Sequence, residues 1–488
     1  MKYILSIDQS TQATKAVLLD EKGKIIKRAD RRHKQIINDK GWVSHDQEEI
    51  YQNLLLAVRD VVEVSGIAKS DLIAVGISNQ RETAAAWDKN GTALGLAVVW
   101  QCSRAEKVAE RLKERAEDIN RKTGLPLSPY FSASKMTWLI ENEIREEEYH
   151  LGTMDSWLLF KLTGGKSFKT DYSNASRTQL FNIHTLAWDE ELCALFGIPL
   201  ESLPEICDSN SCFGYTDFEG FLEEAIPIHA VLGDSHGALY GQGCHMRGMV
   251  KTTYGTGSSI MMNIGEKALE TDSGLAVSLA WCIDGKAEYV LEGNINYTGA
   301  VVAWLQDDMH MIETPKELEE QLKLAKEEDS AILVPAFTGL SAPYWRGDAK
   351  AMLYGMTRTT GRAEVIKAAV ESIAYQITDV IKMMEQISKT DIKELRADGG
   401  PTGNQYLMQF QSDMAEAVLC VASSEELSAI GAGYMAGIKA GLYEKEEVFQ
   451  NLSYNRYSPQ MSPQVRESKY EAWKKAVAIV LNTERSSF

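Results

Sequence analysis

The feature that most constrains the fold of this chain is one local pattern that occurs twice. A buried strand ("KYILSIDQ"), a tight polar turn ("QSTQAT") and a second strand ("KAVLLD") open the first half of the chain. The same order returns in the second half as "MVKTTY", "GTGS" and "SIMMNIG". Apolar runs bounded by small and hydroxyl residues predict strands joined by turns. The repetition resembles an internal duplication, although the identity between the halves is too low to establish it.

Length and charge narrow the class of protein. A chain of 488 residues is expected to form two to four domains. Its hydrophobic content of 44% and charged content of 25% are ordinary for a globular enzyme. A formal net charge of −18 argues against a nucleic-acid partner and against an anionic membrane surface. An anionic ligand such as a nucleotide would therefore need a few local donors or a metal ion.

The cysteines and the start of the chain predict the compartment. The seven cysteines are scattered and form no CxxC pair, so neither a zinc site nor a disulfide framework is indicated. Reduced thiols fit a cytoplasm. The apolar run in "MKYILSIDQS" is too short for a signal peptide, and no other run is long enough to cross a bilayer. We therefore expect a cytoplasmic protein with no membrane insertion.

Two segments of the second half have clear local patterns. Apolar residues recur at helical spacing from Ala363 to Met384, which predicts a helix. The glycine-rich stretch Ala397 to Asn404 lies between an expected strand and an expected helix, where it is suited to nucleotide binding. It has neither P-loop nor dinucleotide-fold spacing, which disfavours both classes. The acidic run Glu141 to His150 is interpreted as a solvated helix face.

An acid in the stretch "AVLGDSHGALYG" raises the question of function. Asp234 follows a short apolar run and is flanked by glycines and a serine. Most Gly-Asp pairs are turns, so a turn aspartate is one interpretation. The other is a carboxylate at the end of a buried strand, aimed into a ligand cleft.

The two turns of the repeated pattern are candidates for phosphate binding. In "DQSTQATK" (Asp8 to Lys15) a carboxylate ends a strand, and hydroxyl residues follow it. Such a turn presents donors to phosphate while the acid holds Mg²⁺. In "TTYGTGSS" (Thr252 to Ser259) the glycines around Thr256 allow a ligand to approach the backbone closely. Polar hairpins are common, so one such turn alone is weak evidence for phosphate binding. Two matching turns, one in each half of the chain, are stronger evidence.

A charged pair and two aromatic residues suggest a hydroxylated ligand. Arg81 and Glu82 are adjacent at the end of an expected strand, either as a structural salt bridge or as partners for neighbouring hydroxyls of a polyol. Trp100 and Tyr130 are core residues in one interpretation and cover the C–H faces of a sugar in the other.

Taken in order, these segments resemble the FGGY carbohydrate kinases, and within them the glycerol kinases. The similarity runs nearly end to end and includes "GWVSHDQEEI", "GISNQRET", "TYGTGS" and "VPAFTGLSAPYW". The two signature stretches of the family appear as "YFSASKMTWLIEN" (Tyr130 to Asn142) and "AMLYGMTRTTGRAEVIKAAVE" (Ala351 to Glu371).

The resemblance implies an α/β, two-lobe actin-like ATPase (ribonuclease H-like) fold, duplicated, with a ligand cleft between the lobes. It implies a lobe at 1–243 that binds the polyol and carries the catalytic base, and a lobe at 244–488 that binds the nucleotide. The implied reaction is ATP-dependent phosphorylation of a terminal hydroxyl of a small polyol, by in-line transfer with Mg²⁺.

Site residues follow from the resemblance position by position. Asp234 is implied as the general base, and Asp8 as the acid that holds Mg²⁺ through water or phosphate. The acceptor is expected at Arg81, Glu82, Trp100, Tyr130, Asp234, Ser235 and Ser259. The nucleotide is expected at Thr11, Gln12, Lys15, Thr256, Gly299, Gly400 and Asn404.

The chain departs from the family at two acceptor positions. Ser235 stands where glycerol kinases carry a glutamine, and Ser259 stands where they carry a phenylalanine. The smaller lining raises an alternative, a kinase for a longer polyol or ketose of the erythritol, threitol, xylitol, arabinitol or xylulose type. The other interpretation, in which His236 or a water restores the lost contact, stays open. On the nucleotide side Lys15 replaces an arginine, and Ala303 stands where a glutamine is frequent.

Other function classes fit less well. A sugar-responsive binding protein on the same fold predicts the loss of one of the two acids, and both Asp8 and Asp234 are present. A chaperone-like ATPase clamp needs a peptide-binding appendage for which the two lobes leave no residues. The expected partners are a small polyol and MgATP, with a homodimer or a higher homo-oligomer implied by the resemblance.

Overall fold

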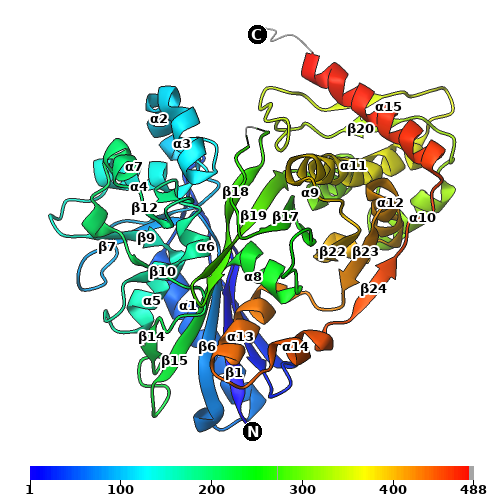
Figure 1. Ribbon diagram of the computed structural model, residues 1–488. Helices are drawn as coiled ribbons and strands as arrows, with labels where there is room; N and C mark the ends of the chain where they lie inside the picture. Colours follow the sequence, from blue (N-terminus) through cyan, green and yellow to red (C-terminus); the bar gives the residue numbers. More distant parts are fainter. Residues whose placement is uncertain (272, 483–488) are drawn as a thin grey trace.

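The structure, a computed structural model, describes residues 1–271 and 273–482. One of its two large sheets has six strands in the order β14-β15-β6-β1-β2-β3 (Figure 1). The bounds are Gly214–Thr216 (β14), Ile226–Gly233 (β15), Leu72–Asn79 (β6), Tyr3–Gln9 (β1), Ala13–Leu19 (β2) and Ile25–Arg32 (β3). β1, β6 and β15 run parallel, while β1, β2 and β3 form an antiparallel meander. Every residue of β1 is buried, including the polar residues Ser6, Asp8 and Gln9.

The other large sheet has seven strands in the order β18-β19-β17-β16-β22-β23-β24. The bounds are Ala276–Ile283 (β18), Lys286–Ile295 (β19), Ser258–Gly265 (β17), Val250–Tyr254 (β16), Glu394–Asp398 (β22), Val418–Ala422 (β23) and Tyr454–Tyr457 (β24). Here too the first strand, β16, starts an antiparallel meander on one side and pairs in parallel with a later strand on the other. The two sheets therefore share the arrangement around their first strand, as the repeated sequence pattern predicts, and the second sheet adds β18 at its edge beside β19.

The remaining strands form smaller sheets. A five-stranded sheet joins β4 (Ile36–Ile37), β5 (Val43–His45), β8 (Ala97–Val98), β7 (Ala84–Trp87) and β9 (His150–Thr153). Three further pairs are β10 (Lys169–Asp171) with β13 (Glu205–Cys207), β11 (Phe181–Asn182) with β12 (Ala187–Trp188), and β20 (Ile332–Val334) with β21 (Met352–Tyr354).

Helices lie between and around the sheets (Figure 1). Those before residue 250 are α1 (Gln47–Ser65), α2 (Glu106–Arg111), α3 (Ala116–Thr123), α4 (Ser132–Asn142), α5 (Met154–Leu162), α6 (Tyr172–Ala175), α7 (Glu190–Phe196) and α8 (Asp234–Gly241). Those after it are α9 (Gly299–Ala303), α10 (Pro315–Leu324), α11 (Arg362–Ser388), α12 (Gln405–Ala415), α13 (Leu427–Lys439), α14 (Lys445–Val448) and α15 (Pro463–Asn482).

One helix of the second half packs against the sheet of the first half. Figure 1 shows α13 beside β1 and β6. The approach is close because glycines line it: a Cβ on Gly76 would lie 2.2 Å from the carbonyl oxygen of Ala432. On the same helix, a Cβ on Gly431 would lie 1.9 Å from the carbonyl oxygen of Gly237 in α8. Backbone therefore touches backbone on two sides of α13.

The local predictions have mixed outcomes. The helix expected over Ala363 to Met384 is confirmed as α11, and the glycine-rich loop does lie between β22 and α12. The interpretation of Glu141 to His150 as a helix face is wrong, because α4 ends at Asn142 and a loop follows. The division at 243/244 stays a prediction. Within the described residues, no helix is long and apolar enough to cross a membrane.

Candidate active site

The predicted base, Asp234, is the first residue of α8 and directly follows β15. Its side chain is 34% exposed. Oδ1 accepts hydrogen bonds from Nε of Arg81 at 3.1 Å and from the backbone N–H of Ser235 at 2.6 Å. Oδ2 has no hydrogen-bond partner among the described residues, so one oxygen is fixed while the other is open to a ligand.

Arg81 belongs to a chain of alternating charges buried below Asp234. Nη1 of Arg81 lies 3.0 Å from Oε2 of Glu292, and Nη1 of Arg177 lies 2.7 Å from the same oxygen. Nε of Arg177 donates to Oε1 of Glu82 at 2.6 Å. The order Glu82–Arg177–Glu292–Arg81–Asp234 is named the charge chain below. Its four members other than Asp234 are at most 6% exposed, so water screens them little.

The charged groups of the charge chain shift one another's pKa values. Burial would raise the pKa of Glu292, but Arg177 and Arg81 hold it well below its ordinary value. Burial would lower the pKa of Arg81, but Glu292, Glu82 and Asp234 raise it well above its ordinary value. Both groups therefore stay charged. Glu82 also has a positive φ of 59°, a backbone conformation that L residues rarely adopt.

The two serines that depart from the family are bound to the charge chain. Nη2 of Arg81 donates to Oγ of Ser235 at 3.2 Å, and Oγ of Ser259 donates to Oε1 of Glu292 at 3.3 Å. His236 is fully buried, and its ring nitrogens have no hydrogen-bond partner among the described residues. No part of the His236 side chain is therefore exposed for contact with an acceptor substrate.

The predicted aromatic residues lie together. The rings of Trp100 and Tyr130 meet edge to face with centroids 5.5 Å apart. Nε1 of Trp100 donates to Oγ1 of Thr11 at 3.0 Å, which connects the predicted acceptor side to the first phosphate turn. Lys135, buried in α4, donates to the carbonyl oxygens of Tyr130 and Phe131 and thereby fixes the loop that carries Tyr130. A cavity of about 270 Å³ lies beside Tyr130, Arg177 and Glu292.

At the first phosphate turn, an acidic side chain and a basic side chain lie opposite each other. Asp8 and Lys15 are paired across β1 and β2, and Nζ of Lys15 lies 3.9 Å from Oδ2 of Asp8. Oγ of Ser78 donates to Oδ1 of Asp8 at 2.6 Å. Burial raises the pKa of Asp8 to about 6, against the opposing effects of Lys15 and Ser78. Thr11 is partly buried, whereas Gln12 is exposed.

The predicted nucleotide residues of the second half lie at two adjoining loops. The backbone N–H of Gly299 donates to the carbonyl oxygen of Gly255 at 2.9 Å, beside Thr256. A Cβ on Gly299 would lie 2.8 Å from that oxygen, so only glycine fits there. Gly400 opens the turn before α12, and the side chain of Asn404 accepts from the N–H of Leu407 as the cap of that helix. Within the described chain, no hydrogen bond or ion pair joins Gly400 or Asn404 to Asp8 or Asp234.

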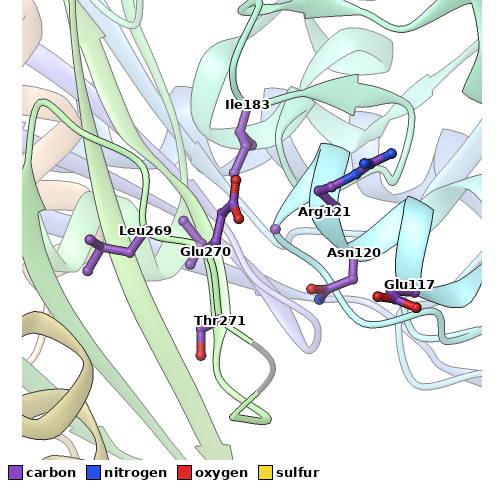
Figure 2. Close-up of a pocket in the computed structure, with 9 residues that line it drawn as sticks. Glu117, Asn120, Arg121, Ile183, Leu269, Glu270 and Thr271 are labelled. Carbon is purple, nitrogen blue, oxygen red and sulfur yellow. The ribbon is translucent and has the colours of Figure 1, made fainter.

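A second cavity, of about 290 Å³, lies away from these residues. Figure 2 shows Glu117, Asn120 and Arg121 of α3 on one side of it and Leu269 and Glu270 on the other. None of the described residues that line it is a predicted site residue. This cavity is therefore not the predicted site.

Sequence reasoning missed two members of the charge chain, Arg177 and Glu292. Arg177 stands in "SNASRTQ" among small and hydroxyl residues, and Glu292 stands in the apolar strand stretch "YVLEGN". A charged residue inside an apolar strand indicates a buried partner, because charges are almost never fully buried alone. That signal identifies Glu292 as unusual, but it does not identify the partner.

Comparisons with known proteins agree across the whole chain. Residues 3–241 match the N-terminal domain, and residues 250–440 the C-terminal domain, of the FGGY family of carbohydrate kinases. Two Thermotoga maritima proteins, glycerol kinase 1 and glycerol kinase 2, are 47% and 42% identical to this chain. The alignments cover 98% and 99% of this chain and 99% and 100% of those proteins.

Solved structures show the same fold. The crystal structure of Plasmodium falciparum glycerol kinase with ADP has a TM-score of 0.93 and 35% identity, with 99% of each chain covered. The xylulose kinase from Lactobacillus acidophilus has a TM-score of 0.89 at 21% identity, again with 99% of each chain covered. The predicted two-lobe actin-like α/β fold is confirmed by these likenesses.

Proposed function

This chain belongs to the FGGY family of carbohydrate kinases, and from that membership we propose that it transfers the terminal phosphoryl group of ATP to a terminal hydroxyl of glycerol. The observation that carries the proposal is the position of Asp234, with Oδ1 held by Arg81 and Oδ2 open. Glycerol is favoured over the longer polyols and ketoses, because the similar relatives are named glycerol kinases.

The proposed chemistry assigns the proton to Asp234. Its open oxygen accepts the proton of the acceptor hydroxyl while the hydroxyl oxygen forms a bond to the γ-phosphorus of ATP. The bond from that phosphorus to the bridging oxygen breaks, and ADP leaves. A base within hydrogen-bond reach contributes about 10²–10⁴-fold to the rate. Arg81 keeps the carboxylate oriented, and the remaining acceptor contacts come from Glu82, Trp100, Tyr130, Ser235 and Ser259.

We assign the nucleotide to the two phosphate turns and the loops beside α9 and α12, that is, to Thr11, Gln12, Lys15, Thr256, Gly299, Gly400 and Asn404. Mg²⁺ neutralises the phosphate charge when it is bound. In kinase sites this ion is held by one or two carboxylates together with the phosphates and water. Asp8 fits that role, since it is a buried carboxyl with one oxygen, Oδ2, that receives no hydrogen bond from a described residue. No cluster of three metal-ligating side chains occurs among residues 1–271 and 273–482.

The test is a coupled ADP-release assay with MgATP and glycerol, erythritol, xylitol or xylulose as the acceptor. Asp234→Asn is the blank, because it keeps the shape of the side chain and removes the base. We expect glycerol to be the best acceptor and the variant to lose about 10²–10⁴-fold in kcat. Equal ADP release by the two proteins with every acceptor would refute the kinase proposal, and a longer acceptor as the best substrate would refute glycerol.

The location and assembly of the protein are part of the same proposal. We expect it in the cytoplasm as a homodimer or a higher homo-oligomer. Cell fractionation and light scattering after size-exclusion chromatography test the two statements separately.

A further inference from the structure

Lys15 has two acidic neighbours, and the nearer one lies far away in the sequence. Its Nζ donates to Oε2 of Glu426 at 3.0 Å, whereas Oδ2 of Asp8 is 3.9 Å away. The shorter contact has the length of a hydrogen bond between charged groups, which is about twice as strong as a neutral one. Glu426 therefore determines where the ammonium group of Lys15 lies.

Glu426 is itself held firmly. Its side chain is 7% exposed, and its other carboxylate oxygen, Oε1, accepts from Nη1 of Arg28. The backbone N–H of Glu426 donates to Oγ of Ser424 at 3.3 Å. Both oxygens of the carboxylate are thus occupied by cations from the first sheet, one from β2 and one from β3.

The helix that follows Glu426 fixes it relative to both acids. Glu426 directly precedes α13. Two residues later, Oγ of Ser428 donates to the carbonyl oxygen of Asp234 at 2.9 Å. Oγ of Ser6 in β1 donates to the carbonyl oxygen of Ala429 at 2.6 Å. The start of α13 is therefore bound to the strand that carries Asp8 and to the residue proposed as the base.

The distance between Lys15 and Asp8 has a chemical consequence. A lysine side chain is a point charge on a flexible stem. Without Glu426, its ammonium group would close on Asp8 and neutralise the carboxylate, or it would swing into solvent. In either position it is lost to a phosphate at the turn. Glu426 prevents both by competing with Asp8 for the ammonium group.

We propose that Glu426 is a positioning residue for phosphoryl transfer, which holds Lys15 beside Asp8 but apart from it, so that Lys15 is available to the transferred phosphoryl group. This inference rests on the proposed function, because the role of Lys15 toward phosphate belongs to that proposal. Glu426 acts only through Lys15 and touches neither substrate.

The test compares Glu426→Gln with Glu425→Gln. The control makes the same change one residue away, at an exposed glutamate. We expect kcat/KM for MgATP to fall about 10–100-fold in Glu426→Gln, the value of one charge-assisted hydrogen bond, and to stay unchanged in Glu425→Gln. The KM for glycerol should stay within about 2-fold in both variants, since no acceptor contact is removed. Loss of stability alone would not separate the two substrates in this way.

A double-mutant comparison decides whether the effect passes through Lys15. In a Lys15→Met background, adding Glu426→Gln should cause no further loss of kcat/KM for MgATP. An equal loss in both backgrounds, or no loss in either, would overturn the inference. MgATP affinity by calorimetry gives a second readout that needs no turnover. If the wild-type protein phosphorylates no acceptor, the proposed function fails, and the inference is still decided by whether Glu426→Gln weakens MgATP binding only when Lys15 is present.

Discussion

At the scale of single residues, Asp8 and the charge chain show how burial prepares a site and what it costs. The carboxyl group of Asp8 is buried near the end of β1, so its charged form is disfavoured. The ammonium group of Lys15 and the hydroxyl group of Ser78 offset that cost only in part. Glu82 and Glu292, the two buried carboxylates of the charge chain, have their partners already in place.

Asp8→Asn should stabilise the protein at neutral pH and abolish its activity. The pKa of Asp8 is raised from 3.8 to about 6 in the folded protein, so the cost of its charge is absent below about pH 4 and complete above about pH 6. Two pKa units correspond to about 3 kcal/mol, which is an upper value for the gain. Urea unfolding at pH 8 and at pH 4 measures it. A variant that is less stable than the wild type at pH 8 would contradict this expectation.

Glu292→Gln should have the opposite effect on stability. It leaves Arg177 and Arg81 buried with one carboxylate fewer between them. Breaking a buried pair by removing one partner costs about 3–5 kcal/mol. The free energy of unfolding in urea tests this, with Glu266→Gln as the matched control at an exposed glutamate just after β17. Equal stability of the two variants would contradict this prediction.

At the scale of elements, the contact between α8 and α13 depends on glycine. Gly431→Ala places a Cβ 1.9 Å from the carbonyl oxygen of Gly237, so one helix must move. We expect a loss of about 3 kcal/mol in unfolding free energy. A lower kcat should accompany it, because Asp234 begins α8. Gly347→Ala is the control, since a Cβ there meets nothing within 4 Å. Similar melting temperatures for the two variants would contradict the prediction.

Elements with a strong local signal were predictable from the sequence, and those set by distant contacts were not. The apolar periodicity of α11 and the turns of the two opening hairpins were sufficient to place them. The acidic run after α4 is as polar as an exposed helix face, and its composition does not distinguish a helix from a loop. The partners of Glu292 are Arg81, just after β6, and Arg177, in a loop after α6, and no local pattern connects these segments.

The residues of the candidate site also fall into those that the sequence predicts and those that it does not. The resemblance predicted Asp8, Asp234 and the residues expected to bind the acceptor, because they stand in recognisable motifs. It did not supply Arg177, Glu292 or Glu426, whose importance lies in pairing across long stretches of chain. It also gave no indication that Ser235 and Ser259 are bound to the charge chain.

At the scale of the whole molecule, α13 connects the second half of the chain to the sheet of the first half. It follows β23 of the second sheet along the chain, and it packs on β1 and β6 of the first sheet (Figure 1). We therefore predict one cooperative unfolding transition instead of two, despite the two separate sheets. Coincident urea curves from tryptophan fluorescence and far-UV circular dichroism would confirm this. Two resolved transitions would show that the packing of α13 does not couple the lobes.

The glycines beneath α13 also limit how the gene can be divided. A fragment ending near residue 243 would carry Asp8, Lys15 and Asp234 but would leave the surface around Gly76 without its cover. A fragment containing the remainder would present α13 without a sheet to receive it. Each piece would thus expose what the other buries. Co-expression of the two is then a route to a split enzyme whose activity reports on reassembly.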